Sequence, residues 1–287
     1  MQWKEFDRLI EAALLEDGAR RDVTTDALIP AGMRCRAEMT AKETGIICGL
    51  PLAARLCRAF DRRLRFRPCC EDGEEVERGT VVATVSGPAA SVLKVERTML
   101  NFVQHLSGIA TLTRRYVDAV AGTGAQILDT RKTTPGWRLL EKYAVRCGGG
   151  SNHRMGLSDQ VLIKDNHLSL RREAGGAGGI ADAVRAARKA SRRLLVEVEV
   201  QSLQELADAL PAEPDIILLD NMTPRQVREG AALVRQRCAG GRRPLLEASG
   251  GINLGNVRAY AKAGADRISI GALTHSAPAL DVSLEIE

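Results

Sequence analysis

Polar side chains follow several short apolar runs in the second part of the chain, at the point where each run ends. Such runs are typical of strands, and active sites form at the carboxyl ends of the strands in α/β barrels. The polar segments are Asp129-Thr130-Arg131-Lys132, Lys164-Asp165-Asn166-His167, Asp220-Asn221, Ser249-Gly250-Gly251 and Gly271. Because so many strand ends carry such groups, we expect them to form one site.

The charges in and around these segments indicate an anionic ligand. The cations are Arg131, Lys132, His153, Arg154 and Lys164, and the carboxylates are Glu197, Glu199 and Asp220. Cations gathered in one place repel one another unless a multiply anionic substrate compensates them. Arginine suits bidentate contacts to carboxylate or phosphate, whereas lysine acts as a point charge. The carboxylates can hold a divalent metal or the hydroxyl groups of a ribose.

Glycine-containing turns predict where a phosphate binds. Ser249-Gly250-Gly251 and Gly271 each follow a strand, and small residues there let backbone N–H groups approach a phosphate. The stretch CGGGSNHRMG at 147–156 follows no strand. We expect its glycines to turn the backbone tightly, so that His153 and Arg154 project into the mouth of the site.

The elements that position these residues form repeated βα units. Such units predict a parallel sheet, either doubly wound or closed as a barrel. A barrel is favoured because Glu197 and Glu199 alternate with valines, which a strand buried on both faces would not tolerate. The expected strands are 126–129, 161–164, 194–200, 215–219, 244–248 and 267–270, and the expected helices include 180–191, 202–210, 224–237 and 254–263. About six units are recognisable, so the expected fold is an incomplete α/β barrel.

The first part of the chain has a different pattern. Helices are expected at 3–16, 51–60 and 89–107, and strands within 33–48 and 74–87. On the 89–107 helix, the polar residues Lys94, Arg97, Asn101 and Gln104 align on one face, which usually means a solvated face. The GGAGG segment at 175–179 lacks the strand and spacing of a dinucleotide fingerprint, so we expect a linker.

Composition excludes several classes of protein. The chain has 287 residues, 45% of them hydrophobic and 27% charged, as in globular proteins. Its net charge of +5 is scattered, and aromatics make up only 3%, so a nucleic-acid stacking surface is not expected. The seven cysteines form no C-x-x-C spacing, which predicts no zinc or redox motif. Free thiols and a charged N-terminal segment favour a cytoplasmic location, without nucleic-acid or membrane partners.

Long motifs resemble the quinolinate phosphoribosyltransferase family. They are DVTT (22–25), VERTMLNFVQHLSGIAT (95–111), LDTRKTTPGWRLLEKYAVRCGGGSNHRMGLSDQVLIKDNH (128–167), VEVEV (196–200), ILLDN (217–221), EASGGI (247–252) and ISIGALTHS (268–276). The resemblance implies a glycosyltransferase of NAD biosynthesis. It implies transfer of the phosphoribosyl group of phosphoribosyl pyrophosphate to quinolinate with decarboxylation, which gives nicotinate mononucleotide, pyrophosphate and CO₂.

The resemblance also implies Mg²⁺ as cofactor and a homodimer with shared active sites. The implied organisation is an N-terminal α/β domain at 1–108, a barrel at 109–275 and a tail at 276–287 that packs back on the first domain. In the implied dimer, each N-terminal domain covers the barrel of its partner. This arrangement would make the polar face around Arg97 an interface rather than a solvated surface.

Site residues follow from the resemblance motif by motif. Quinolinate would be bound by Thr130, Arg131, His153, Arg154 and Lys164, together with Arg97 of the neighbouring subunit. Phosphoribosyl pyrophosphate would be bound by Lys132, Glu199, Asp220, Ser249, Gly250, Gly251, Gly271 and His275. Lys132, Glu199 and Asp220 would also act in catalysis, the two carboxylates with the metal, directly or through the substrate pyrophosphate. Glu197 would support the site without touching substrate.

Three alternatives stay open at this point. One is a paralogue of the same fold associated with molybdate transport, although the motifs of its site depart from those present here. Another is a non-catalytic polyanion-binding protein, which predicts a basic stripe on the surface. The third is a Schiff-base aldolase that acts through a buried Lys164.

Overall fold

The structure is a computed structural model that describes residues 1–174 and 179–287. The expected glycine linker therefore falls mostly on residues 175–178, outside the described part. The chain divides into two compact units. The first contains residues 1–114, 134–149 and 273–287, and the second contains 115–133 and 150–272. None of the helices in the described part is long and apolar enough to cross a membrane.

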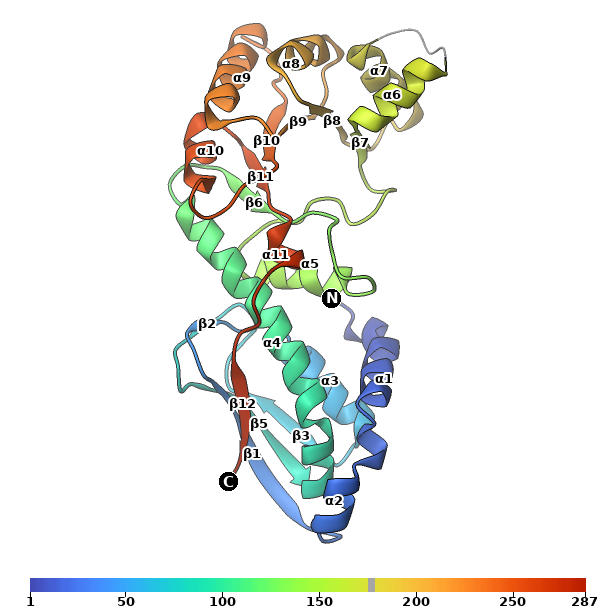
Figure 1. Ribbon diagram of the computed structural model, residues 1–287, viewed down its shortest axis with the longest axis vertical. Helices are drawn as coiled ribbons and strands as arrows, with labels where there is room; N and C mark the ends of the chain where they lie inside the picture. The colour runs from blue at the N-terminus through green and yellow to red at the C-terminus, as the bar shows by residue number, and fades with distance from the viewer. Residues whose placement is uncertain (175–178) are drawn as a thin grey trace. The chain divides into compact units, whose positions relative to one another are not determined.

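The first unit contains a four-stranded antiparallel sheet, in the order β12-β1-β5-β3 (Figure 1). Its strands are β1 (Arg34–Ala41), β3 (Arg65–Pro68), β5 (Val81–Pro88) and β12 (Val282–Ile286). The pairing of β12 with β1 runs from Ala37–Ile286 to Ala41–Val282, so the last strand of the chain lies beside the first. A separate pair is formed by β2 (Gly45–Ile46) and β4 (Glu75–Val76).

Helices complete this unit. They are α1 (Asp7–Glu16), α2 (Val23–Leu28), α3 (Leu50–Phe60), α4 (Ala89–Ala119), α5 (Arg138–Cys147) and α11 (Ala272–His275), with short 3-10 turns at Trp3–Phe6 and Ala19–Arg21. The last residues of α4, 115–119, and the first residue of α11 are counted with the second unit. The predicted apolar face of α4 is confirmed, because Val92, Val95, Met99, Phe102, Val103 and Leu106 are all buried. The sequence predicts that this helix ends near residue 107, but the helix continues past Gly108.

The polar face of α4 is only partly solvated. Lys94 pairs with Asp26 at 2.5 Å, and the side-chain amide of Gln104 donates to the carbonyl of Val282 at 2.8 Å. Arg97 and Asn101 remain exposed. The predicted stripe therefore divides into two anchored and two exposed side chains.

Six parallel strands form the second unit, in the order β6-β11-β10-β9-β8-β7. They are β6 (Gln126–Leu128), β7 (Val161–Ile163), β8 (Val196–Val200), β9 (Ile216–Asp220), β10 (Leu245–Ser249) and β11 (Arg267–Ser269). Its helices are α6 (Asp165–Glu173), α7 (Ile180–Ala190), α8 (Leu203–Ala209), α9 (Pro224–Arg237) and α10 (Val257–Ala263), with a 3-10 turn at Leu210–Ala212. In Figure 1, helices α8, α9 and α10 lie outside the strands. The predicted α/β fold with its parallel six-stranded sheet is confirmed.

The division of the chain differs from the predicted boundaries at residues 134–149, which carry α5. This segment belongs to the first unit rather than to the barrel. Within that unit, Glu141 of α5 is 3.1 Å from His105, and the Tyr143 hydroxyl donates to Asp72 at 2.8 Å. A Cβ on Gly148 would lie 2.4 Å from the carbonyl oxygen of Ala110, so glycine allows α5 to end directly against α4.

Two buried or half-buried aspartates hold the amino ends of neighbouring barrel strands. Asp215 accepts the N–H of Val196 at 2.7 Å, and Asp266 accepts the N–H of Leu246 at 2.9 Å. Arginines lie on the outer side of both carboxylates: Arg188 and Arg242 at Asp215, and Arg243 at Asp266. These contacts lie at the opposite end of the strands from the predicted site.

Candidate active site

Strand register places the polar side chains of the barrel on one face of its sheet. Paired residues of parallel strands point to the same side, and residues two apart share that side. The strand pairing joins Glu199 to Leu218, Leu218 to Glu247, Glu247 to Arg267 and Ser249 to both Asp220 and Ser269. Glu197, Glu199, Asp220, Glu247, Ser249, Arg267 and Ser269 therefore face the same way. The alternation of Glu197 and Glu199 with buried valines follows from this arrangement.

A buried ionic cluster occupies this face. The Nε2 atom of His153 lies 3.1 Å from Glu197 and 3.3 Å from Glu247. Arg267 lies 2.7 Å from the other oxygen of Glu247, and the amide of Gln160 donates to Glu197 at 2.5 Å. Both carboxylates are fully buried, and His153 is 7% exposed. Each buried charge therefore has a partner of opposite charge or a hydrogen-bond donor, as buried charges require.

The pKa values of these groups reflect their mutual contacts. Burial raises the pKa of Glu197, and the charge of Glu247 raises it further, against the effect of His153. Burial alone would raise the pKa of Glu247, but His153 and Arg267 together hold it below its ordinary value. Burial lowers the pKa of His153, and its hydrogen bonds to Glu197 and Glu247 raise it by more, to about 9.

The second ring nitrogen of His153 also has a partner. The backbone N–H of Arg154 lies 2.8 Å from Nδ1 and donates to it, so Nδ1 carries no hydrogen in this geometry. In the neutral ring, the proton therefore lies on Nε2, between the two carboxylates. The negative charges of Glu197 and Glu247 favour a second proton on the ring, at Nδ1. Because the N–H of Arg154 points at Nδ1, that protonation requires the N–H to turn away. Both ring nitrogens thus have partners within the protein, and the ring of His153 orients the backbone N–H of Arg154.

Asp129 anchors the loop that carries His153. This carboxylate is fully buried, accepts the backbone N–H of His153 at 2.9 Å and accepts the amide of Asn152 at 2.5 Å. The preceding residue, Ser151, forms a parallel bridge with Leu128 at the end of β6. Gly149 has a φ of +87°, a conformation that favours glycine. The glycine run therefore ends in a segment that lies along the edge of the sheet.

Two arginines with like charges lie close to one another in this part of the barrel. Arg154 is buried and donates to the carbonyl of Gln160 at 3.2 Å. Burial lowers the pKa of Arg154, and the charge of Arg131 lowers it further. The Nε atom of Arg131 is buried and has no hydrogen-bond partner among the described residues. An anion placed there would supply the missing acceptor and relieve the repulsion.

The remaining predicted barrel residues lie at the carboxyl ends of the strands and are more exposed. Lys132 and Lys164 are exposed, whereas Thr130, Glu199 and Asp220 are half-buried. Burial raises the pKa of Glu199, and the charge of Asp220 raises it further, against the charge of Lys164. Two carboxylates that repel one another on adjacent strands, both with oxygen donors, fit a hard divalent cation such as Mg²⁺.

The predicted phosphate turns have the required backbone freedom. Gly250 and Gly251 have φ values of +94° and +62°, and a Cβ on Gly250 would lie 2.1 Å from Oδ1 of Asn221. Gly271 follows β11 in the same unit. Arg97 and His275, also predicted site residues, belong to the first unit, where both are exposed. His275 there contacts Ser276 at 2.6 Å.

The sequence prediction missed several residues of the buried cluster. Glu247, Arg267 and Gln160 were not assigned a role, and neither was Asp129. The sequence predicts Asp129 at the site as part of the strand-end segment 129–132, but not its role in holding the His153 loop. Glu247 and Arg267 become recognisable only through the register of β10 and β11, because each lies inside a strand rather than after it.

His153, Glu197 and Glu247 also lie close enough together to hold a metal ion. Arg267 already provides a positive charge at Glu247, at 2.7 Å. A second cation at this place would be repelled by Arg267. The carboxylates of Glu199 and Asp220 are therefore the better candidates for a divalent metal in the barrel.

The fold is an open parallel α/β barrel, with cations and carboxylates at the carboxyl ends of its strands. These two features place the chain in a class of protein, the barrel enzymes that bind substrate at that end of the strands. Comparison with known proteins narrows the class. Residues 22–107 match the profile described as "Quinolinate phosphoribosyl transferase, N-terminal domain", and residues 109–285 match that of the C-terminal domain. The chain belongs to the quinolinate phosphoribosyltransferase family, which confirms the resemblance.

Individual relatives agree with this assignment. The chain is 46% identical to "Nicotinate-nucleotide pyrophosphorylase [carboxylating]" of Mycobacterium leprae, over 98% of both chains. It is 39% identical to the probable enzyme of that name from Bacillus subtilis, over 100% of this chain and 95% of the relative. The solved nicotinate-nucleotide pyrophosphorylase from Francisella tularensis superposes with a TM-score of 0.92 at 38% identity, over 100% and 98% of the two chains.

Proposed function

We propose that this protein transfers the phosphoribosyl group of phosphoribosyl pyrophosphate to quinolinate and releases pyrophosphate and CO₂, with nicotinate mononucleotide as product. The observation that carries the proposal is the pair of arginines in the barrel, Arg131 and Arg154, one of which has a buried Nε without a partner. Membership of the family and the names of the relatives support the same reaction.

Quinolinate would bind through its two carboxylates. The guanidinium groups of Arg131 and Arg154 suit bidentate contacts to a carboxylate, and exposed Lys164 adds a third positive charge. Because both nitrogens of His153 have protein partners, we assign His153 to the positioning of Arg154. Thr130, whose hydroxyl accepts the N–H of Lys132 at 3.0 Å, holds the turn between the two substrates.

Phosphoribosyl pyrophosphate would bind at the neighbouring strand ends. The turns at Ser249-Gly250-Gly251 and Gly271 would take the 5′-phosphate, and Lys132 would neutralise the pyrophosphate. As the bond from the anomeric carbon to pyrophosphate breaks, that carbon gains positive charge, which the carboxylates of Glu199 and Asp220 stabilise. Mg²⁺, held by these carboxylates directly or through the pyrophosphate, would supply electrostatic stabilisation of the leaving group.

The pyridine nitrogen of quinolinate then forms the new bond to the anomeric carbon and becomes cationic. The carboxylate beside that nitrogen leaves as CO₂, because the cationic ring stabilises the electron pair left on carbon. A proton then replaces CO₂ on the ring. Arg131 and Arg154 keep the ring in place throughout, and no step requires a covalent bond to the protein.

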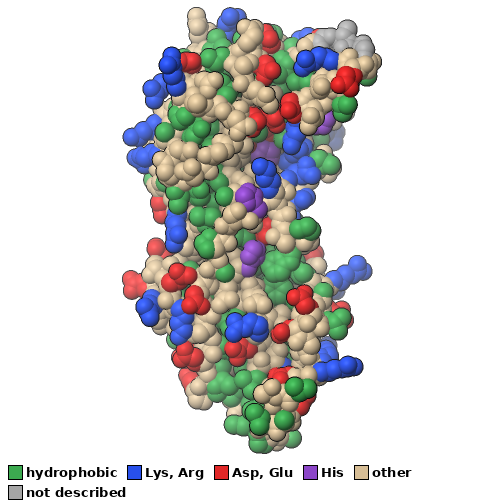
Figure 2. Space-filling model, in the orientation of Figure 1, with side chains coloured by type: hydrophobic (Ala, Val, Ile, Leu, Met, Phe, Trp, Pro, Cys, Tyr) green, Lys and Arg blue, Asp and Glu red, His purple; other side chains and the backbone are tan. Residues whose placement is uncertain are grey.

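We further propose a homodimer in which Arg97 of one subunit completes the site of the other. Arg97 is exposed on α4, so it is available for such a contact. The aldolase alternative is not favoured, because Lys164 is exposed and lacks the apolar surroundings of a Schiff-base lysine. On the face in Figure 2, basic side chains are interspersed with acidic ones, unlike the basic stripe of a polyanion-binding protein.

A turnover assay tests the proposal. Purified protein with Mg²⁺, quinolinate and phosphoribosyl pyrophosphate should form nicotinate mononucleotide, pyrophosphate and CO₂ in equal amounts, measured by chromatography and CO₂ release. Nicotinic acid should be a much poorer acceptor, because it lacks the second carboxylate. Equal use of nicotinic acid, or no product with quinolinate, would contradict the assignment.

A further inference from the structure

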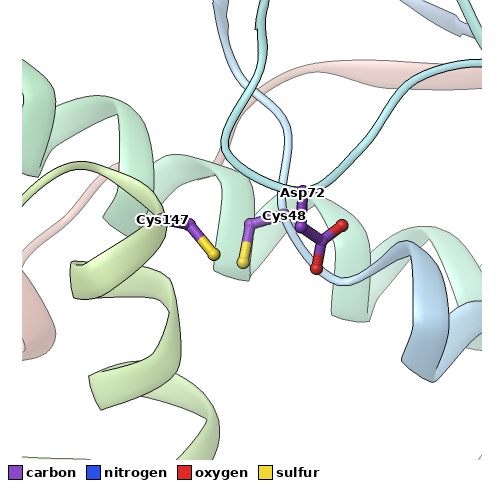
Figure 3. Close-up of side chains that lie close together, drawn as sticks. All are labelled: Cys48, Asp72 and Cys147. Atoms are coloured by element: carbon purple, nitrogen blue, oxygen red, sulfur yellow. The ribbon is translucent and has the colours of Figure 1, made fainter.

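Two cysteines and an aspartate meet in the first unit, away from the residues assigned to the proposed reaction. Cys48 follows β2, Asp72 precedes β4 and Cys147 ends α5. The two Sγ atoms and a carboxylate oxygen of Asp72 all lie within 4.8 Å of one another. Figure 3 shows both thiols between the α5 end and the Asp72 carboxylate. Three segments far apart in the sequence thus converge with donor atoms on one point.

Hydrogen bonds hold the carboxylate of Asp72 in this orientation. Its Oδ2 atom accepts the N–H of Gly49 at 2.9 Å and the hydroxyl of Tyr143 at 2.8 Å, and Oδ1 accepts the N–H of Leu50 at 3.0 Å. Metal ligands in proteins are commonly oriented by such outer contacts. A carboxylate oxygen has two lone pairs, so Oδ1, which accepts the N–H of Leu50, can also bind a ligand.

The two sulfur atoms lie close enough together to bind one cation. The thiolate is the form of cysteine that binds a metal, so a cation between Cys48 and Cys147 would take the place of the thiol protons and stabilise both thiolates.

We propose that Cys48, Cys147 and Asp72 bind a Zn²⁺ ion through two sulfur atoms and one carboxylate oxygen. Water completes the tetrahedron, because three protein ligands leave the fourth position open. Binding releases the thiol protons to solvent, so affinity rises with pH. The site is separate from the proposed transferase reaction, and its role is to join the end of α5 to the β2–α3 and β4 segments.

The chemistry of the donors selects the metal. Thiolates favour soft or borderline cations such as Zn²⁺ over Mg²⁺, which prefers oxygen ligands. Cys147 and Asp72 are half-buried, so an ion can reach the site, whereas Cys48 is buried and closes its inner side. The sequence predicts no zinc motif, because the cysteines have no C-x-x-C spacing. That criterion covers only cysteines that are close in the sequence, whereas tertiary structure brings these cysteines together.

The first experiment uses the unaltered, tag-free protein, fully reduced. After Zn²⁺ addition and gel filtration, elemental analysis should give a single zinc per chain. Alkylation with N-ethylmaleimide, mapped by mass spectrometry, should show half-buried Cys147 protected by zinc, with Cys69 and Cys238 still modified. Replacement by Co²⁺ should give sulfur-to-cobalt charge-transfer absorption. No retained zinc, or protection of other cysteines instead, would overturn the proposal.

Variants then assign the ligands. Cys147→Ser and Asp72→Asn should each weaken zinc binding by roughly tenfold or more, measured by competition with a chromogenic chelator. Cys238→Ser is the matched control, because Cys238 is also half-buried but lies in the other unit, and its zinc affinity should be unchanged. Unchanged affinity in Cys147→Ser would overturn the proposal even if turnover of quinolinate is normal in every variant.

Discussion

Arg131 and Arg154 bring two positive charges into one part of the barrel, and the buried Nε of Arg131 lacks an acceptor among the described residues. Arg131→Gln should therefore lower kcat/KM for quinolinate by roughly tenfold to a hundredfold, the usual effect of losing hydrogen bonds to a charged group. Steady-state kinetics with each substrate varied would measure this. Arg185→Gln, which removes an exposed arginine from α7, is the control, and an equal loss there would contradict the assignment.

Glu247 contacts His153, and we expect it to act through that residue rather than by touching substrate. Because Glu247 raises the pKa of His153, Glu247→Gln should move the titration of the His153 ring to lower pH, as followed by NMR. The same change leaves Arg267 without its carboxylate partner and should lower kcat/KM by about tenfold or more through misplacement of Arg154. Glu229→Gln, on the exposed face of α9, should change neither quantity. A ring titration that stays unchanged in Glu247→Gln would exclude this role.

Residues at the site differ in how far the sequence reveals them. Arg131, Lys164 and Asp220 follow apolar runs, so their position at strand ends can be predicted from local pattern. Glu247 and Arg267 lie within strands, and their meeting with His153 depends on which strands are neighbours. That order is set by packing of the whole sheet, which local pattern does not encode.

At the scale of elements, the ionisation of Asp215 makes the stability of the barrel depend on pH. Burial would raise the pKa of Asp215, but the N–H of Val196 and Arg188 hold it below its ordinary value of 3.8. A lowered pKa in the folded state means that this stabilisation is present above the ordinary value and is lost as pH falls through the lowered one. Asp215→Asn should therefore be less stable at neutral pH, by roughly 1–3 kcal/mol, and lose less stability on acidification.

Urea unfolding at neutral and acidic pH would measure the effect of Asp215→Asn. The control is Asp182→Asn, which removes an exposed pair with Arg185 and should change stability by less than about 0.5 kcal/mol. If the two variants respond to pH identically, Asp215 has no special part in acid stability.

Gly108 shows why the predicted end of α4 was too early. A glycine within a helical pattern often marks a helix end. Here a Cβ at Gly108 would lie 2.0 Å from the carbonyl oxygen of Pro278, so the glycine permits close approach of the C-terminal segment. Local sequence cannot distinguish these two uses of glycine, because the contact comes from a residue far along the chain.

Gly108→Ala should consequently destabilise the protein, although alanine is the better helix former. We expect a loss of roughly 1–3 kcal/mol from overpacking, against a gain of about 1 kcal/mol in helix propensity at an open position. Thermal unfolding would measure it. Gly241→Ala is the control, since no atom lies within 4 Å of its added Cβ. A more stable Gly108→Ala would mean that the contact with Pro278 yields easily.

At the scale of the whole molecule, the proposed sharing of Arg97 between subunits predicts complementation. Arg97→Ala and Lys164→Ala should each be nearly inactive alone. Mixed after dissociation and reassociation, they should recover about a quarter of full activity, because half the dimers are mixed and each has one intact site. A mixture of Arg131→Gln with Lys164→Ala should recover nothing beyond its components, since both residues lie in the same barrel. No recovery with Arg97→Ala would argue against a shared site.

The domain organisation could be predicted in its main outline but not at its boundaries. The change from mixed elements to repeated βα units is visible in the sequence. Residues 134–149 lie between two barrel segments, yet they join the first unit through contacts such as Tyr143 with Asp72. A discontinuous unit of this kind has no local signature.

The pairing of β12 with β1 has a consequence for synthesis on the ribosome. Both segments of the second unit, residues 115–133 and 150–272, have been translated before residues 282–286 are added. The first unit, although its strand β1 is made early, exposes an unpaired edge along that strand until β12 is translated. The unit that begins the chain is therefore the last to be completed, and during translation its open edge is available to chaperones or to other nascent chains.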